Sequence, residues 1–216
     1  MLRQNRTLKS LDISSNCITD IDPVTGTLTT TNNVLTGTLT ITKNVLKILK
    51  VRHNLIKRIE KSAWMDDLTE VDLARNELDK DSGKAIAYML VKSKTLKILQ
   101  VWGNPGIRSS IPEMMQTLRD NTTLIELGIP VHHESVMPVG EMLAQNKMLQ
   151  YLNLKPDLKG DSIDWRPIVD DLRRNQDSKL KKLIMDADGV RHLKTQLEAV
   201  KSDLLVVCGN FKNEYL

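Results

Sequence analysis

Aromatic side chains are scarce in this chain. They make up 3% of its 216 residues, and phenylalanine occurs once. The core must therefore be built from leucine, isoleucine, valine and methionine, a composition that suits an aliphatic ladder better than a bulky sandwich core. Cysteine is also rare. Cys17 and Cys208 lie near opposite ends of the chain, which argues against a disulfide framework or a cysteine-based metal site.

Long apolar runs are missing as well. No stretch approaches the roughly 18–20 apolar residues of a membrane-spanning helix, and Met1–Arg6 lacks the apolar segment of a signal peptide. We therefore expect a cytoplasmic protein with no membrane insertion. In such a protein the glycosylation sequons at Asn5 and Asn121 are chance matches.

Neither sign of charge is in large excess. The chain has 31 Lys and Arg against 27 Asp and Glu, which gives a net charge of +4 and an isoelectric point near 9.0. A nucleic-acid binder needs its cations gathered on one face, and here they are scattered among carboxylates. We expect no nucleic-acid partner.

The common catalytic motifs are also missing from the sequence. It contains no glycine-rich phosphate loop, His-Glu-x-x-His motif or Gly-x-Ser-x-Gly elbow. Asp79–Gly83 and Asp186–Gly189 resemble only the start of a calcium loop, and we expect His132–Glu134 to lie in an exposed loop rather than to bind metal. The chain is therefore expected to be no enzyme and to use no cofactor, metal or small-molecule substrate.

What the sequence does contain is a repeated pattern, which is clearest at Leu96–Ile107. This segment follows the spacing L-x-x-L-x-L-x-x-N, with Leu99 and Val101 at the fourth and sixth places and Asn104 at the ninth. The alternating apolar residues predict a strand. The asparagine side chain can form hydrogen bonds with the backbone where that strand ends.

The pattern recurs along the whole chain. Its copies begin at Leu8, Leu46, Leu68, Leu96, Leu124, Leu149 and Leu180. The last three copies lack the asparagine. From the second copy onward the starting points are 22, 28, 28, 25 and 31 residues apart, close to the period of roughly 20–29 residues of leucine-rich repeats.

The segments between the later copies carry apolar residues at helical spacing. The expected helices are Asp81–Val91, Ile111–Leu118, Val136–Gln145, Trp165–Arg174 and Val190–Val200. A short strand at Leu204–Val207 should close the chain. We expect Trp64 and Trp165 to lie in the core.

Lys84–Gly103, a helix followed by Lys-Thr-Leu-Lys-Ile-Leu-Gln-Val-Trp-Gly, resembles the ribonuclease-inhibitor-like class of leucine-rich repeats. The resemblance implies an α/β solenoid, or horseshoe, of about seven repeats, with parallel strands on the concave face and helices on the convex face. It covers most of the chain, so residues 1–216 are expected to form a single repeat domain. Met1–Arg6 resembles the end of a helix, and we expect the chain to be a fragment of a longer solenoid.

The first half of the chain departs from this class. Residues 19–45 form a threonine-rich insertion that contains a tandem duplication. Thr25–Leu35 and Thr36–Leu46 are identical at nine of eleven positions. Threonine-rich alternation around Leu39 and Ile41 favours extended chain over helix. The insertion is either a tolerated surface feature or a binding loop.

The resemblance places the third, fifth and seventh residues of each copy on the concave face, where the charges are mixed. Lys50 and Asp72 stand at the fifth place of neighbouring strands, about 4.8 Å apart, and should pair. Trp102 is either a binding hot spot or packs over the Pro105–Gly106 turn. The candidate protein-binding residues are Trp102, Gln100, Lys50, Arg52, Asp72, Arg75 and Tyr151.

These observations favour a non-catalytic protein–protein interaction scaffold, which binds a partner protein of unknown identity on its concave face. Relatives of the resembled class leave two alternatives. One is a GTPase-activating protein of the ribonuclease-inhibitor-like repeat type, for which Arg75 and Arg108 are candidate arginines. The other is a tropomodulin-like actin regulator, although the chain shows no flanking amphipathic actin-binding segment.

Overall fold

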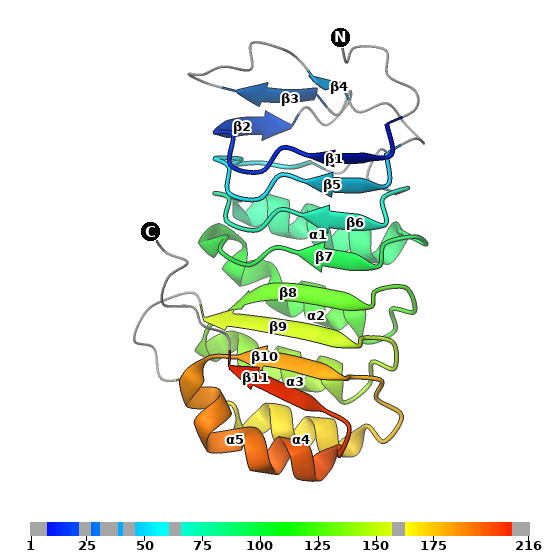
Figure 1. Ribbon diagram of the computed structural model, residues 1–216, viewed down its shortest axis with the longest axis vertical. Helices are drawn as coiled ribbons and strands as arrows, with labels where there is room; N and C mark the ends of the chain where they lie inside the picture. The colour runs from blue at the N-terminus through cyan, green and yellow to red at the C-terminus, as the bar shows by residue number, and fades with distance from the viewer. Residues whose placement is uncertain are drawn as a thin grey trace.

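The computed structural model describes residues 8–21, 27–30, 39–40, 46–60, 66–156 and 163–208. Its main feature is a parallel sheet of eight strands, stacked along the long axis of the molecule (Figure 1). In spatial order the strands are β1 (Ser10–Asp12), β5 (Ile48–Lys50), β6 (Glu70–Asp72), β7 (Ile98–Gln100), β8 (Glu126–Val131), β9 (Tyr151–Pro156), β10 (Lys182–Met185) and β11 (Leu205–Cys208). The first seven are the strands expected from the repeated pattern, and β11 is the expected closing strand.

Helices cover one face of this sheet (Figure 1). They are α1 (Lys80–Lys92), α2 (Ile111–Leu118), α3 (Val136–Leu143), α4 (Arg166–Arg174) and α5 (Ala187–Val200), with 3₁₀ turns η2 (Pro105–Ser110) and η3 (His133–Ser135). Each expected helix is present, with ends shifted by at most three residues. Helix α1 begins where Asp79 Oδ1 accepts the Ser82 N–H at 2.8 Å, and α2 carries a proline in its first turn, both common starts for helices. The expected α/β solenoid is confirmed.

Strand residues alternate between the helix side and the opposite face, which we call the open face. In β5, β6 and β7 the central residue is buried and its two neighbours are half-buried. The central residues Leu49, Val71 and Leu99 belong to the core that the strands share with the helices. The register aligns the fifth residues of the copies in one row: Asp12, Lys50, Asp72, Gln100, Gly128, Asn153 and Ile184.

A ladder of asparagine side chains satisfies the backbone where the first strands end. Asn104 Nδ2 donates to the Leu73 carbonyl of the preceding turn at 2.9 Å, and its Oδ1 accepts the Leu78 N–H at 3.1 Å. Asn76 and Asn54 make the equivalent bonds one and two turns earlier. All three side chains are buried. They therefore satisfy the hydrogen bonding of backbone groups that water does not reach.

A second polar ladder lies at the opposite edge of the sheet, where each helix leads into the next strand. Asn146 Oδ1 accepts the Leu149 N–H at 2.8 Å, and its Nδ2 donates to the Leu118 carbonyl of the preceding helix at 2.6 Å. Asn121 and Asn175 each donate in the same way to a carbonyl of the helix one turn earlier in the solenoid. The two ladders together hold each turn of the solenoid to its neighbour.

Strands β8 and β9 are six residues long, twice the length of β5, β6 and β7. In the copy that contains β8, His132 stands at the place of the asparagine. Without an asparagine turn the strand continues, and pairing extends to Val131 and Pro156. The sheet is therefore longest beside the segment that carries Trp102.

The threonine-rich segment contributes a second, antiparallel sheet at the N-terminal end. It consists of β2 (Ile18–Ile21), β3 (Thr27–Thr30) and β4 (Leu39–Thr40), in that order. Strands β3 and β4 come from the two tandem copies, and the equivalent residues Leu28 and Leu39 are paired in the register. Extended chain at Leu39 is thereby confirmed. The predictions for Ile41, Trp64 and Met1–Arg6 fall outside the described residues.

Candidate protein-binding face

Trp102 follows β7 and is surrounded by cationic groups. The Nζ atom of Lys155 lies 3.2 Å from the centroid of the Trp102 ring, the guanidinium carbon of Arg52 lies at 4.5 Å and that of Arg75 at 5.7 Å. Trp102 and Lys155 are each only 7% exposed, whereas Arg52 and Arg75 are half-buried, so a partner meets the two arginines before it meets the indole. We call Trp102, Arg52, Arg75 and Lys155 the tryptophan cluster.

Small neighbours allow side chains from distant strands to meet at this ring. Arg52 follows β5 and Lys155 lies in β9, each two strands, or about 10 Å, away from the Trp102 strand. The seventh residues of the intervening copies are Ala74 and Pro130. Because neither carries a long side chain, the cations reach the ring across them.

Gly128 provides the space beneath the ring. It is paired with Gln100 on one side and with Asn153 on the other, and a Cβ atom at this position would lie 2.9 Å from Cδ1 of Trp102 and would overlap Gln100 Oε1. Among the described residues, Gln100 Oε1, Asn153 Oδ1 and Arg75 Nη2 are buried without a hydrogen-bond partner. Two acceptors and one donor next to the ring therefore have no partner within the chain.

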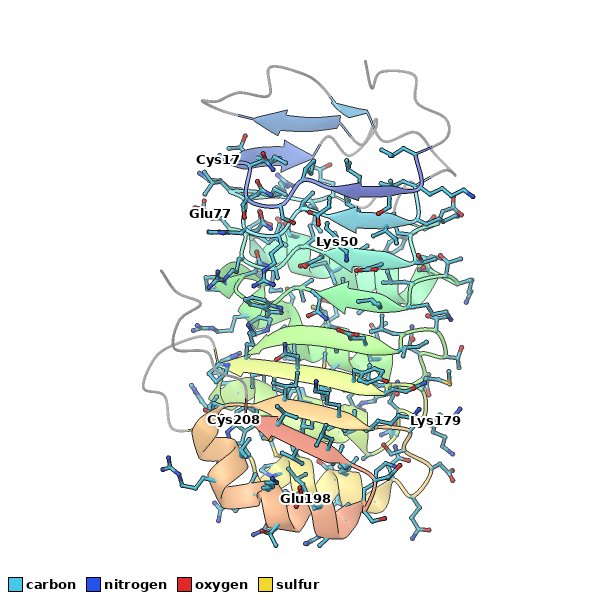
Figure 2. The ribbon with its side chains drawn as sticks, in the orientation of Figure 1. Cys17, Lys50, Glu77, Lys179, Glu198 and Cys208 are labelled. Carbon is cyan, nitrogen blue, oxygen red and sulfur yellow. The ribbon has the colours of Figure 1, made fainter. Side chains whose placement is uncertain are left out.

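Lys50 lies beside the cluster on the open face, where Figure 2 labels it. The register places it next to Asp72, as expected, but its ion pair is with Glu70, at 2.6 Å, which raises the pKa of Lys50. Asp72 Oδ1 instead accepts the Ala74 N–H at 3.0 Å. Burial raises the pKa of Asp72, and this hydrogen bond together with the charge of Arg52 opposes only part of that effect.

Comparison with known protein families agrees with the repeated pattern. A family model described as Leucine Rich repeat matches residues 4–21 and 67–87, which contain β1 and β6. These matches coincide with parallel strands of one sheet that is backed by helices. The chain is built from leucine-rich repeats. No curated protein matches it, and the ribonuclease-inhibitor-like class stays a prediction.

Tyr151 lies farther along the open face of the leucine-rich repeat solenoid. It is 39% exposed, and its neighbours in the register are Glu126 and Lys182. Within the described ranges, no aromatic or cation–π contact joins it to Trp102. The structure thus gathers three of the candidate residues, Arg52, Arg75 and Gln100, around Trp102, with Lys50 and Asp72 next to them.

The expectation that His132 lies in an exposed loop is wrong. His132 is 6% exposed, its Nδ1 lies 2.5 Å from Ser135 Oγ, and its backbone N–H donates to the same oxygen at 3.1 Å. Burial lowers the pKa of His132, although the neighbouring Glu134 opposes this. His133 and Glu134 are exposed, as expected. The part of the chain that the structure describes contains no group of three or more potential metal ligands.

Other features of the leucine-rich repeat chain agree with its composition. Neither Cys17 nor Cys208 forms a disulfide, and both are exposed (Figure 2). Trp165 is buried in the core, which confirms its expected place. In the described ranges, no helix is long and apolar enough to cross a membrane.

Three residues of the site were not among the sequence candidates. Lys155, Asn153 and Gly128 stand at the seventh and fifth places of their copies, so the repeat register put them on the open face. Their approach to Trp102 depends on side-chain directions, which the pattern does not contain. A glycine in the middle of a predicted strand was the available signal, because such a glycine often marks a close approach of another group.

Proposed function

We propose that this protein is a non-catalytic interaction scaffold whose partner protein binds the open face between β5 and β9. The observation that carries the proposal is the tryptophan cluster. Tryptophan and arginine dominate the binding energy of protein interfaces, and here an indole and two guanidinium groups lie together. These side chains lie at the ends of strands of one hydrogen-bonded sheet. Because their backbone is already ordered, binding a partner costs less conformational entropy.

The distribution of charge favours a protein partner over a nucleic acid. Lys50 and Arg52 lie among Asp12, Glu70 and Asp72 on the N-terminal part of the open face. A nucleic-acid groove would present cations of one sign along its length, because phosphate contacts supply most of the affinity. Mixed charges instead fit the complementary charge pattern of a protein interface.

Site-specific photo-crosslinking tests this proposal. Benzoylphenylalanine replaces Tyr151, which is 39% exposed on the open face, and, as a matched control, Tyr88 on α1, which is 41% exposed. In cells that make the protein, we expect a discrete crosslinked protein from position 151 that is not obtained from position 88. No adduct at position 151, or the same adduct from both positions, would contradict binding at the open face.

A GTPase-activating role has less support. The guanidinium of Arg75 lies 5.7 Å from the Trp102 ring and the residue is half-buried, so it can receive a side chain from a partner but does not project into a nucleotide site on another protein. Arg108, in η2, is half-buried. Stimulated GTP hydrolysis by any member of a panel of small GTPases would contradict the non-catalytic proposal.

We further propose that the second half of the chain belongs to the ribonuclease-inhibitor-like class and that the protein acts in the cytoplasm. The alternation of full helices with strands from α1 to α5 supports the class. Two exposed cysteines that form no disulfide fit a reducing compartment. A fluorescent fusion tests the location, since recovery in a secreted or membrane fraction would contradict it.

A further inference from the structure

Two arginines of the tryptophan cluster lack a strong carboxylate partner. Arg52 and Arg75 both lie against the Trp102 ring, and the described residues include no ion pair for either arginine. Asp72 is the carboxylate whose charge interacts with Arg52, but burial raises the pKa of Asp72, and its Oδ1 is already bonded to the Ala74 N–H. Like charges held around one ring repel each other, and a bound anion would remove that repulsion.

The unsatisfied polar atoms specify the kind of molecule that fits. Arg75 Nη2 is a buried donor that needs an acceptor, whereas Gln100 Oε1 and Asn153 Oδ1 are buried acceptors that need a donor. A sulfate or chloride ion supplies acceptors alone. An extended peptide with an acidic side chain supplies both, because its carboxylate accepts from arginine and its backbone N–H groups donate to the amide oxygens.

We propose that the tryptophan cluster is a carboxylate-binding site that takes a Glu or Asp side chain from an extended segment of the partner protein. The guanidinium groups of Arg52 and Arg75, both half-buried, bind the carboxylate oxygens, and the peptide backbone passes beside the Gln100 and Asn153 side chains, whose amide oxygens lack a donor. This inference rests on the proposed function, since it names the chemistry of the partner at the same face.

The test uses the whole chain labelled with 5-fluorotryptophan and observed by fluorine NMR. The chain has three tryptophans, and Trp102→Phe assigns the resonance of the cluster. The probe is a capped hexapeptide with two central glutamates, and the matched probe carries two glutamines. At low ionic strength we expect the glutamate peptide to shift the Trp102 resonance saturably, and to bind at least tenfold more tightly than the glutamine peptide.

Variants decide whether the cluster is the site. Arg52→Gln with Arg75→Gln should weaken the glutamate peptide at least tenfold. Lys57→Gln, which removes a charge from a side chain that is 74% exposed, should leave its affinity unchanged. If the double variant does not fold, Arg52→Lys takes its place, because lysine keeps the charge but lacks the planar guanidinium that binds a carboxylate with two hydrogen bonds. We expect this variant to bind the glutamate peptide several-fold more weakly.

Three results would overturn the proposal: no saturable shift with the glutamate peptide, a shift that the arginine variants leave unchanged, or binding of inorganic phosphate at least as tight as binding of the peptide. The peptide titration does not need the natural partner. A negative titration together with a crosslinked partner at position 151 would therefore reject the carboxylate site alone. A positive titration without that partner would reject the proposed scaffold function alone.

Discussion

Trp102 and Gly128 are in such close contact that a Cβ atom on residue 128 would lie 2.9 Å from Cδ1 of the indole. The same carbon would overlap the side-chain oxygen of Gln100. Glycine at this position is therefore a packing requirement of the open face. The strand itself would accept a larger residue.

Gly128→Ala is expected to lower the free energy of unfolding by about 1–3 kcal/mol, the usual cost of overpacking. Trp102 and Gln100 must both shift to admit the methyl group. Denaturant unfolding measures the change. As a control, the substitution is repeated in a Gln100→Ala background, where part of the space is already empty and the cost should fall. An equal cost in both backgrounds would contradict this packing.

Asn104→Ala should be among the most destabilising substitutions in the asparagine ladder. It removes the bonds to the Leu73 carbonyl and the Leu78 N–H, and each unsatisfied buried group costs about 1–3 kcal/mol. We expect a loss of about 2–4 kcal/mol in denaturant unfolding.

Asn16→Ala is the matched control for this ladder. Asn16 holds the same place in the first copy, but it is exposed and donates to the Ser14 carbonyl within its own loop. Its replacement should cost no more than about 1 kcal/mol. Equal losses at the two positions would show that the ladder adds nothing to an ordinary turn.

Asp72→Asn should stabilise the protein at pH 7. Burial raises the pKa of Asp72, so its favourable contribution is present below the ordinary carboxyl pKa of 3.8 and is lost as the pH rises through the raised value. Asparagine keeps the acceptor for the Ala74 N–H and carries no charge. The difference from the wild type in urea unfolding should vanish below pH 3.8.

Asp177→Asn should change the free energy of unfolding in the opposite direction. The hydrogen bond from Lys147 lowers the pKa of Asp177, so ionisation of this carboxyl favours the fold, and the stabilisation is lost as the pH falls through the lowered pKa. At pH 7 this variant should be slightly less stable than the wild type. If both variants shift stability in the same direction, the burial argument for Asp72 is wrong.

His132 should make stability fall in mildly acidic solution. Burial lowers its pKa, so its contribution is complete above the ordinary histidine pKa of 6.5 and is lost as the pH falls through the lowered value. The His133→Gln variant, changed at the exposed neighbour, should lose as much stability on acidification as the wild type. The His132→Asn variant should lose less. Thermal unfolding between pH 7.5 and 5 compares the variants, and an identical loss in both would contradict the assignment.

The sequence predicted the scaffold because its determinants are local and repeated. The apolar fourth and sixth residues of each copy, such as Leu99 and Val101, lie on the same side of an extended chain, which makes each segment a strand with one buried face. Recurrence of the same pattern then determines the register, because equivalent places in neighbouring copies pair. The helices followed from apolar spacing and from starts such as Asp79, and their ends were least certain because helix termini fray.

The site was only partly predictable, because side-chain reach depends on several strands at once. The register placed Lys50 beside Asp72, but the choice of Glu70 as its partner depends on burial of the Asp72 carboxyl. Lys155 approaches Trp102 because Pro130 lies between them. His132 was expected to be exposed because it lies at the strand exit of a degenerate copy, yet it forms a hydrogen bond with Ser135 inside the fold.

The two polar ladders have a mechanical consequence. The asparagine ladder links the turns up to Asn104, and the helix-side ladder begins at Asn121, which donates to the Leu90 carbonyl of α1. They overlap in the copy that begins at Leu96, which is therefore held at both edges. Under a load applied to its two ends, the solenoid should lose outer turns first, and the segment that carries Trp102 should be the last to give way.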